Sequence, residues 1–171
     1  YPSGAAVLFK KEILDRIGLF DEEYWMYNED QDLGWRIWLS GSRCVLAQQA
    51  VVYHKHDFTR SIQNYYWLDR NRILSIMKNY QFSTLLLISF AFVVMEFGLM
   101  LFTLQRGLIR QKLKVYRYFS NPENWRYILR ARRESQAMRK VSDRDILKIF
   151  RGRIWYDEIG GPGLKLSNVL F

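Results

Sequence analysis

The sequence predicts an α/β fold over residues 1–80, followed by an apolar segment and a basic helical tail. Two short runs rich in β-branched, aromatic and aliphatic residues, 7–9 and 45–53, are typical of strands. Between and after them, apolar residues recur at intervals of three and four positions, as they do on one face of a helix. Helices that alternate with strands favour a layered α/β domain.

The helices are expected at three places within this segment. The first carries apolar residues on one face and stops at a glycine, the set being Ile13, Leu14, Ile17 and Gly18. The second begins near Asn28, which can cap it together with Gln31 three positions later, and it ends at Gly41. The third starts near Ser61 and continues towards residue 80.

The apolar segment, residues 81–105, is predicted to associate with a membrane. From Phe82 to Leu104 it contains no Lys, Arg or Pro and one charged residue, Glu96, and it is long enough to cross a bilayer. Residues 106–171 form the tail, in which apolar and basic residues alternate as in a helix at a membrane interface.

The net charge of +9 lies entirely in the second half of the chain. Residues 1–80 contain 10 Lys or Arg and 10 Asp or Glu, whereas residues 81–171 contain 16 and 7. Such a basic region suits an anionic surface, either lipid or nucleic acid. Because its charges flank an apolar segment, we expect anionic lipid as the partner and no nucleic acid. The single cysteine, Cys44, excludes an internal disulfide and is interpreted as a core residue.

The densest group of carboxylates is Glu29-Asp30-Gln31-Asp32. One interpretation is structural, because carboxylates are favoured at a helix N-terminus. The other is catalytic, because a carboxylate can act as the general base that deprotonates an attacking hydroxyl. The residue types alone leave both open. The same holds for His54, which follows a predicted strand and is either a metal ligand, a proton carrier or a surface residue.

Taken together, these segments resemble the family 2 glycosyltransferases, and specifically the rhamnosyltransferase-like branch. The resemblance rests on the order of five motifs: Ser3-Gly4-Ala5-Ala6, Gly18-Leu19-Phe20-Asp21-Glu22, Glu29-Asp30-Gln31-Asp32-Leu33, Val52-Tyr53-His54 and Asp69-Arg70-Asn71-Arg72. It covers residues 1–80 and departs from the family at Leu19, where glycine is frequent. It implies the C-terminal, acceptor-side half of a GT-A (Rossmann-like) domain.

The resemblance also implies roles for individual residues. Asp30 corresponds to the catalytic base, with Glu29 in the same catalytic motif, and His54 to a ligand of Mg²⁺ or Mn²⁺. The acceptor side is assigned to Asp32, Phe20, Asp21 and Trp25. The expected substrates are a nucleotide-sugar donor and a lipid-linked or polysaccharide acceptor. No Asp-x-Asp motif precedes the acidic cluster, and the chain starts without Met or a leader, so we expect the donor-binding half to lie upstream.

Nucleotide sugars are cytosolic, so the catalytic part is expected on the cytoplasmic side of the membrane. Basic flanks also stay cytosolic, and Glu96 disfavours burial at a bilayer centre. We therefore expect residues 82–104 to dip into or lie along the cytosolic leaflet, broken near residues 96–98. A plain span and a hairpin packed on the soluble part are the alternatives. An inactive membrane-anchored adaptor is the alternative function.

Overall fold

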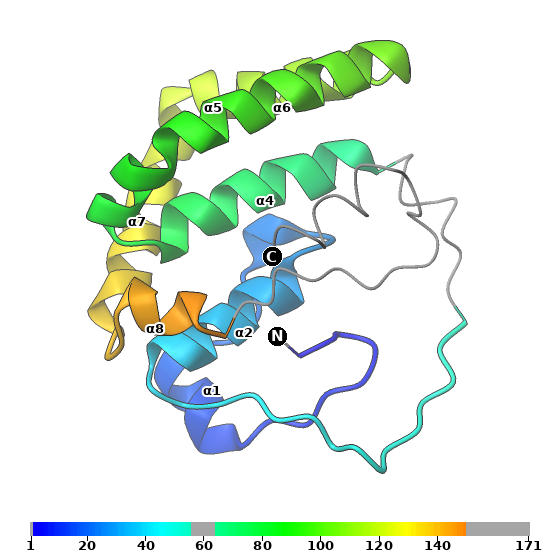
Figure 1. The fold of residues 1–171 in the computed structure, drawn as a ribbon. Coiled ribbons are helices and arrows are strands. Elements are labelled where there is room, and N and C mark those ends of the chain that lie inside the picture. Colours follow the sequence, from blue (N-terminus) through cyan, green and yellow to red (C-terminus); the bar gives the residue numbers. More distant parts are fainter. Residues whose placement is uncertain (1, 56–63, 150–171) are drawn as a thin grey trace.

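The computed structural model describes residues 2–55 and 64–149, which form seven α-helices and one 3₁₀ helix without a β-strand (Figure 1). In chain order the elements are α1 (Lys11–Ile17), η1 (Glu22–Tyr24), α2 (Glu29–Leu39), α4 (Tyr65–Asn79), α5 (Phe82–Gln105), α6 (Ile109–Ser120), α7 (Pro122–Ala137) and α8 (Asp143–Leu147).

The predicted α/β fold is wrong, because the structure is all-helical over these residues and is not Rossmann-like. Residues 7–9 and 45–53 have strand-like composition but form no strand in the described structure. A strand needs a neighbour to share its backbone hydrogen bonds, and an isolated pair is marginal at best. Leu8 and Leu46 are 97% and 87% exposed, so these runs also lack the burial that their composition suggested.

Two predicted helices are confirmed, and each ends within two residues of the glycine that was expected to terminate it. Helix α1 ends at Gly18 and helix α2 is followed by Gly41, and both glycines have positive φ (82° and 79°), which residues with a Cβ rarely adopt. The capping box at Asn28 is wrong. Asn28 makes no side-chain cap and instead donates from Nδ2 to the side-chain oxygen of Gln31, 2.8 Å away.

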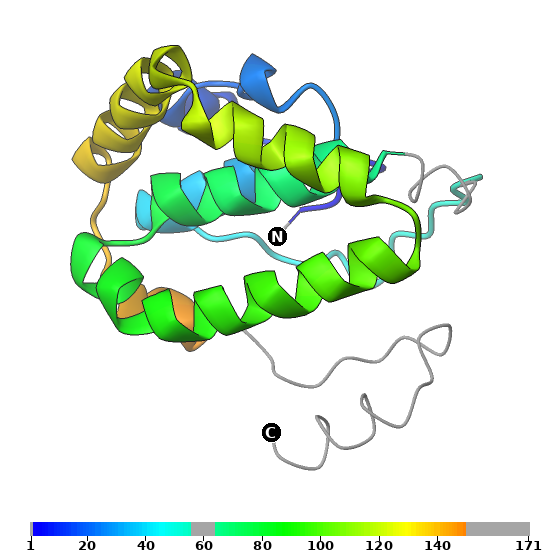
Figure 2. The same ribbon diagram turned by 90° about the horizontal axis from the view of Figure 1, so that it is seen from above.

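Helix α4 is the centre of the described structure, since α2, α6 and α7 all pack against it. Figure 2 shows α4 between α5 and α6 in projection, with α7 beyond the left end of α6. One apolar cluster joins α4 to α7 and η1 through Tyr24, Leu74 and Ile128. Another joins α2 to the start of α5 and to α8 through Trp35, Leu39, Tyr80 and Ile146. The basic tail is thus part of the same packed unit as the acidic motif up to α8.

Helix α5 runs unbroken through residues 96–98, so the expected break is wrong. Its less exposed residues recur every three or four positions along the whole helix, as Leu85, Ile88, Phe92, Glu96, Leu99 and Thr103. One side of α5 therefore faces the rest of the protein. Glu96, near the middle, accepts hydrogen bonds from Arg72 on α4 and from Lys112 on α6, the latter at 2.7 Å.

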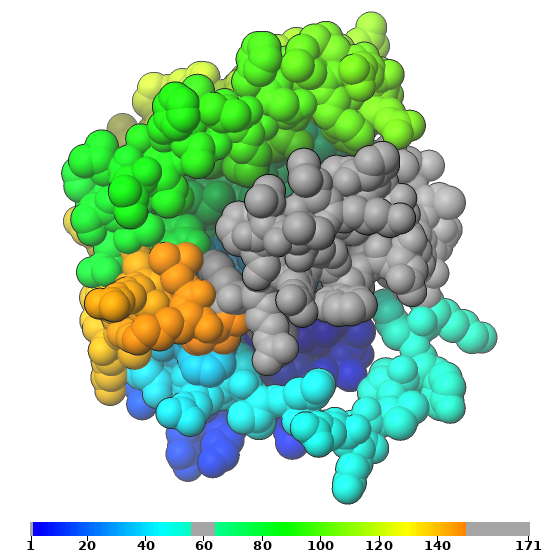
Figure 3. Space-filling model, in the orientation of Figure 1, coloured from blue at the N-terminus to red at the C-terminus, as the bar shows by residue number. Residues whose placement is uncertain are grey.

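The other side of α5 is exposed and apolar. It includes Leu87, Phe90, Val93, Phe97 and Leu104, each more than half exposed. The helix is long and apolar enough to cross a membrane, with a mean hydropathy of 2.4 in its most apolar window. In Figure 3, α5 forms an uncovered ridge along the upper edge of the molecule.

Candidate functional site

The segment that leads into the acidic motif has an unusual backbone. Three residues without the freedom of glycine, Trp25, Tyr27 and Asn28, have φ of 57°, 65° and 64°, in the left-handed region. Such conformations are costly and persist only where surrounding contacts enforce them, frequently at functional sites. The segment 25–28, here called the left-handed turn, delivers the chain directly to Glu29 at the start of α2.

Helix α4 supplies the contacts that enforce this turn. The side-chain nitrogen of Asn71 lies 2.9, 2.7 and 2.7 Å from the carbonyl oxygens of Tyr24, Met26 and Tyr27. Its neighbour Arg70 donates to the carbonyl oxygen of Glu23, and its guanidinium stacks over aromatic rings. Asn71 is fully buried, so its amide has no water to replace these partners. The Arg-Asn pair that the sequence singled out therefore holds the turn in place.

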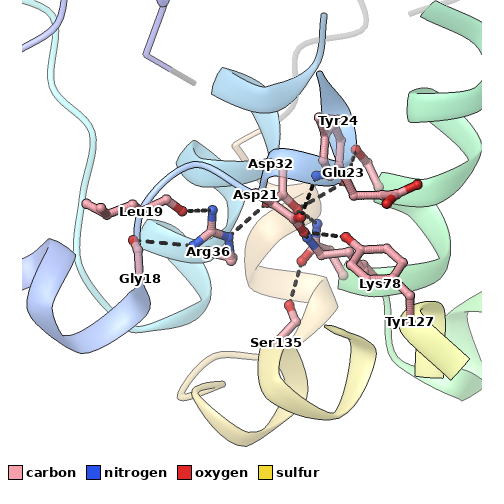
Figure 4. Close-up of polar contacts among 12 residues, drawn as sticks. Gly18, Leu19, Asp21, Glu23, Tyr24, Asp32, Arg36, Lys78, Tyr127 and Ser135 are labelled. Carbon is pink, nitrogen blue, oxygen red and sulfur yellow. Dashed lines mark hydrogen bonds and ion pairs between the residues drawn. The ribbon is translucent and has the colours of Figure 1, made fainter. Parts of the chain in front are cut away.

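Asp32 is the centre of a buried polar network (Figure 4). Its carboxylate is 0% exposed and accepts from Arg36 at 2.9 Å and Asn79 at 3.0 Å, with Lys78 also at 3.0 Å. Tyr24 lies 3.2 Å away, and burial, followed by the charge of Asp32, raises the pKa of this phenol well above 10.0. The carboxylate reaches no surface in the described structure, and the contact of Asp32 with an acceptor stays a prediction.

Asp21 lies at the edge of the same network and is partly exposed. Lys78 donates to it at 2.6 Å, and the hydroxyl of Tyr127 on α7 donates as well. Burial by itself would raise the pKa of Asp21, but the charge of Lys78 and these hydrogen bonds outweigh it, so the pKa is lowered. Asp21 therefore stays ionised and ties the start of η1 to α4 and α7.

Asp30 lies at the start of α2 and is half-buried. One carboxylate oxygen accepts from the backbone N–H of Gly4 at 2.8 Å and the other from that of Gln31 at 2.7 Å. A carboxylate has about four lone-pair sites, so two remain for a substrate hydroxyl. Beside it, Oε2 of Glu29 is buried and has no hydrogen-bond partner among the described residues. Burying such an oxygen costs free energy unless a ligand or a water molecule donates a hydrogen bond to it.

Two other predicted acceptor-side residues lie on the surface. Phe20 and Trp25 are 44% and 74% exposed, and Trp25 belongs to the left-handed turn. An indole held in solvent by a strained backbone can stack on a sugar or another planar-faced ligand. These two residues are therefore open to a ligand, in contrast to Asp32.

His54 is exposed in the extended segment that follows α2, and His56 lies outside the described residues. Within residues 2–55 and 64–149, no three His, Cys, Asp or Glu side chains come together as a metal site. The described residues therefore hold no complete metal site by themselves, and the Mg²⁺ or Mn²⁺ that the resemblance implied stays a prediction.

Sequence reasoning missed the polar side of α4. Its buried polar residues recur at intervals of three and four positions and face η1 and α2, the set being Asn71, Ser75, Lys78 and Asn79. This periodicity could have shown that the helix carries a polar stripe rather than an apolar one. Tyr127 on α7 gave no comparable signal, since its partner Asp21 is 106 positions away.

Two curated proteins are similar to part of the chain. Both are named N-acetylglucosaminyl-diphospho-decaprenol L-rhamnosyltransferase, from the CDC 1551 / Oshkosh and ATCC 25618 / H37Rv strains of Mycobacterium tuberculosis. Each is 40% identical over 52 residues, which are 30% of this chain and 17% of the relative's length. No family model and no solved structure matches. The chain therefore has a partial similarity to a rhamnosyltransferase.

Proposed function

We propose that the chain is the acceptor-side part of a glycosyltransferase that moves a sugar from a nucleotide-sugar donor to a lipid-linked or cell-surface glycan. The observation that carries the proposal is the half-buried Asp30, held by two backbone N–H groups immediately after a left-handed turn. A general base must keep a fixed position and still offer a lone pair to the attacking hydroxyl. Asp30 meets both requirements.

Asp30 acts as the general base in this proposal. It takes the proton of an acceptor hydroxyl while the hydroxyl oxygen bonds to the sugar's anomeric carbon and the nucleoside diphosphate leaves with the electrons of the broken bond. Glu29, the neighbour of Asp30 in the motif, and Trp25, in the left-handed turn before it, contact the acceptor. Asp32 and Asp21 act indirectly, by fixing α2 and η1 to α4 and α7.

The partial similarity supports this choice of reaction over an inactive adaptor. The name of the two relatives makes a rhamnosyl donor and an N-acetylglucosaminyl-diphospho-polyprenol acceptor the first substrates to test. We further propose that donor binding requires a segment outside residues 1–171, and that residues 1–171 alone do not turn over a nucleotide sugar.

A membrane surface is the proposed location, with the acidic motif on the cytoplasmic side. The support is the exposed apolar side of α5, together with the basic residues exposed on α6, Arg110, Lys114 and Arg117. Cations beside an apolar surface favour anionic lipid. The ion pairs of Glu96 favour a helix that lies along the surface, because a spanning α5 would carry Arg72 and Lys112 towards the bilayer centre with it.

The test is Asp30→Asn in a protein that joins this chain to a donor-binding segment, assayed with the two substrates above. Loss of a general base lowers turnover by on the order of 10²-fold or more. Asp15→Asn, on the exposed side of α1, is the matched control and is expected to leave turnover unchanged. Near-normal turnover of Asp30→Asn would exclude the role, and an inactive parent protein would favour the adaptor.

A further inference from the structure

We propose that a cavity between α2, α4 and α5 binds the apolar chain of the lipid-linked acceptor. This inference rests on the proposed function, which supplies an acceptor attached to a lipid, and it adds where on the protein that lipid is held. The cavity lies between one side of α5 and the facing residues of α2 and α4.

The cavity has a volume of about 340 Å³, within the range of pockets that bind small molecules. Most of its wall is apolar. Helix α5 contributes Ile88, Ala91, Phe92 and Met95, and opposite them lie Trp35, Ile76 and Tyr80. The rings of Trp35 and Tyr80 pack edge to face with centroids 4.7 Å apart, which gives the wall a fixed shape.

One end of the cavity reaches the acidic motif. Asn28 and Gln31 line it there, joined by a hydrogen bond of 2.8 Å, and they flank Glu29 and Asp30 in the chain. The polar end of a bound lipid would therefore lie at the first turn of α2, which also carries the proposed base, although Asp30 itself does not line the cavity. The opposite wall belongs to α5, whose outer surface is exposed and apolar. The cavity wall thus belongs to a helix whose outer side is suited to apolar chains, which favours an apolar chain over a polar ligand in the cavity.

The charges around the cavity argue against an anion as the occupant. Among the described residues, Arg72 is the one charged residue that lines it, and its guanidinium is already paired with Asp69 at 2.7 Å and with Glu96. An anion would have to compete with two carboxylates for this group. The wall thus offers apolar surface along its length and neutral hydrogen-bonding groups at one end.

Photolabelling tests the proposal without requiring turnover. The probe is a polyprenyl phosphate with a diazirine in its chain, presented to the protein in phosphatidylcholine vesicles, and the labelled residues are located by mass spectrometry. We expect labels on Trp35, Ile76 and Tyr80 within the cavity. Ala91→Trp places a large ring at the cavity wall and is expected to reduce these labels several-fold.

Val93→Trp is the matched control, because Val93 lies on the opposite, exposed side of α5 and does not line the cavity. It should leave the cavity labels unchanged. Equal labelling of the wild-type and Ala91→Trp proteins would overturn the proposal, as would labels confined to the outer side of α5. If circular dichroism shows that Ala91→Trp is not folded, Met95→Trp takes its place with the same criteria.

Competition separates the acceptor lipid from ordinary membrane lipid. Unlabelled polyprenyl phosphate should remove the cavity labels, whereas the same amount of phosphatidylglycerol should not. Equal competition by phosphatidylglycerol would mean that the cavity holds bulk lipid, and the proposal would be wrong. If the cavity is labelled but the protein transfers no sugar, the proposed function is wrong and this inference stands. If the protein transfers sugar but the cavity is not labelled, this inference is wrong and the proposed function stands.

Discussion

The side-chain nitrogen of Asn71 lies 2.7 Å from the carbonyl oxygen of Tyr27, although the two residues are 44 positions apart. This contact makes the left-handed turn a tertiary feature. The turn cannot persist on local preference, because Trp25, Tyr27 and Asn28 all disfavour positive φ to different degrees. The position of Asp30 therefore depends on a residue of α4 that does not touch it.

Asn71→Asp is predicted to destabilise the protein by about 1–3 kcal/mol, because the buried carbonyl groups lose their donor and face a carboxylate instead. Urea denaturation followed by circular dichroism measures the change. Gln48→Glu, in an exposed segment, adds the same charge and should shift the unfolding midpoint little. Equal midpoints for Asn71→Asp and wild type would show that the turn does not need this contact.

Lys112→Met is predicted to cost up to about 3–5 kcal/mol, since Lys112 is 0% exposed and its removal leaves Asp69 and Glu96 to share the charge of Arg72. Thermal and urea unfolding in detergent measure this loss. Lys114→Met removes an exposed charge from the same helix and should change stability by less than about 0.5 kcal/mol.

Adding Glu96→Gln to Lys112→Met should restore part of the lost stability, because it removes one of the two negative charges that Lys112 had neutralised. If the changes in unfolding free energy of the two substitutions simply add, the result would contradict an ion-pair network that joins α4, α5 and α6.

The Asp21 interaction is predicted to depend on pH. Its pKa in the folded protein is lowered from the ordinary 3.8, so the stabilisation is complete above 3.8 and is lost as the pH falls through the lowered value. Asp21→Asn should therefore be less stable than wild type at neutral pH, and the difference should shrink as the pH drops below 3.8. Urea midpoints across this range measure it. A difference that is constant with pH would show that proton binding to Asp21 is not involved.

The orientation of α5 can be tested with single cysteines in a Cys44→Ala background. Gln48→Cys and Lys114→Cys lie before and after α5 and are both exposed in the structure. In intact cells both should be protected from an impermeant thiol reagent, because a helix that lies along one leaflet keeps both flanks on one side. Both should react after lysis. Labelling of Lys114→Cys alone from outside would mean that α5 spans the membrane.

His54 is predicted to supply one ligand of a metal site that is completed outside the described residues, since these hold no group of three metal-binding side chains. His54→Ala should raise the Mn²⁺ concentration needed for half-maximal transfer without abolishing activity. The measurement is a metal titration of the protein used for the Asp30→Asn test. An unchanged titration would remove His54 from the metal site.

Several helices were predictable because their signals are local. The glycine stops at Gly18 and Gly41 follow from the backbone freedom of that residue, and the apolar helix of α5 follows from an uninterrupted run of side chains. The acidic motif itself could also be located, because Glu29 and Asp30 are adjacent in the chain. The sequence determined these features by itself, since each depends on residues within one or two helical turns.

The tertiary structure decided the rest. The runs 7–9 and 45–53 have strand-like residues, but a strand also requires a partner, which composition does not supply. Asp32 and Asp30 are equivalent carboxylates in the sequence, yet packing of α4 buries Asp32 and leaves Asp30 accessible. Glu96 looked like an isolated charge in an apolar run, and only folding brought Lys112 to it. In each case the deciding contact joins distant parts of the chain, and long-range pairing of this kind leaves no periodic trace in the sequence.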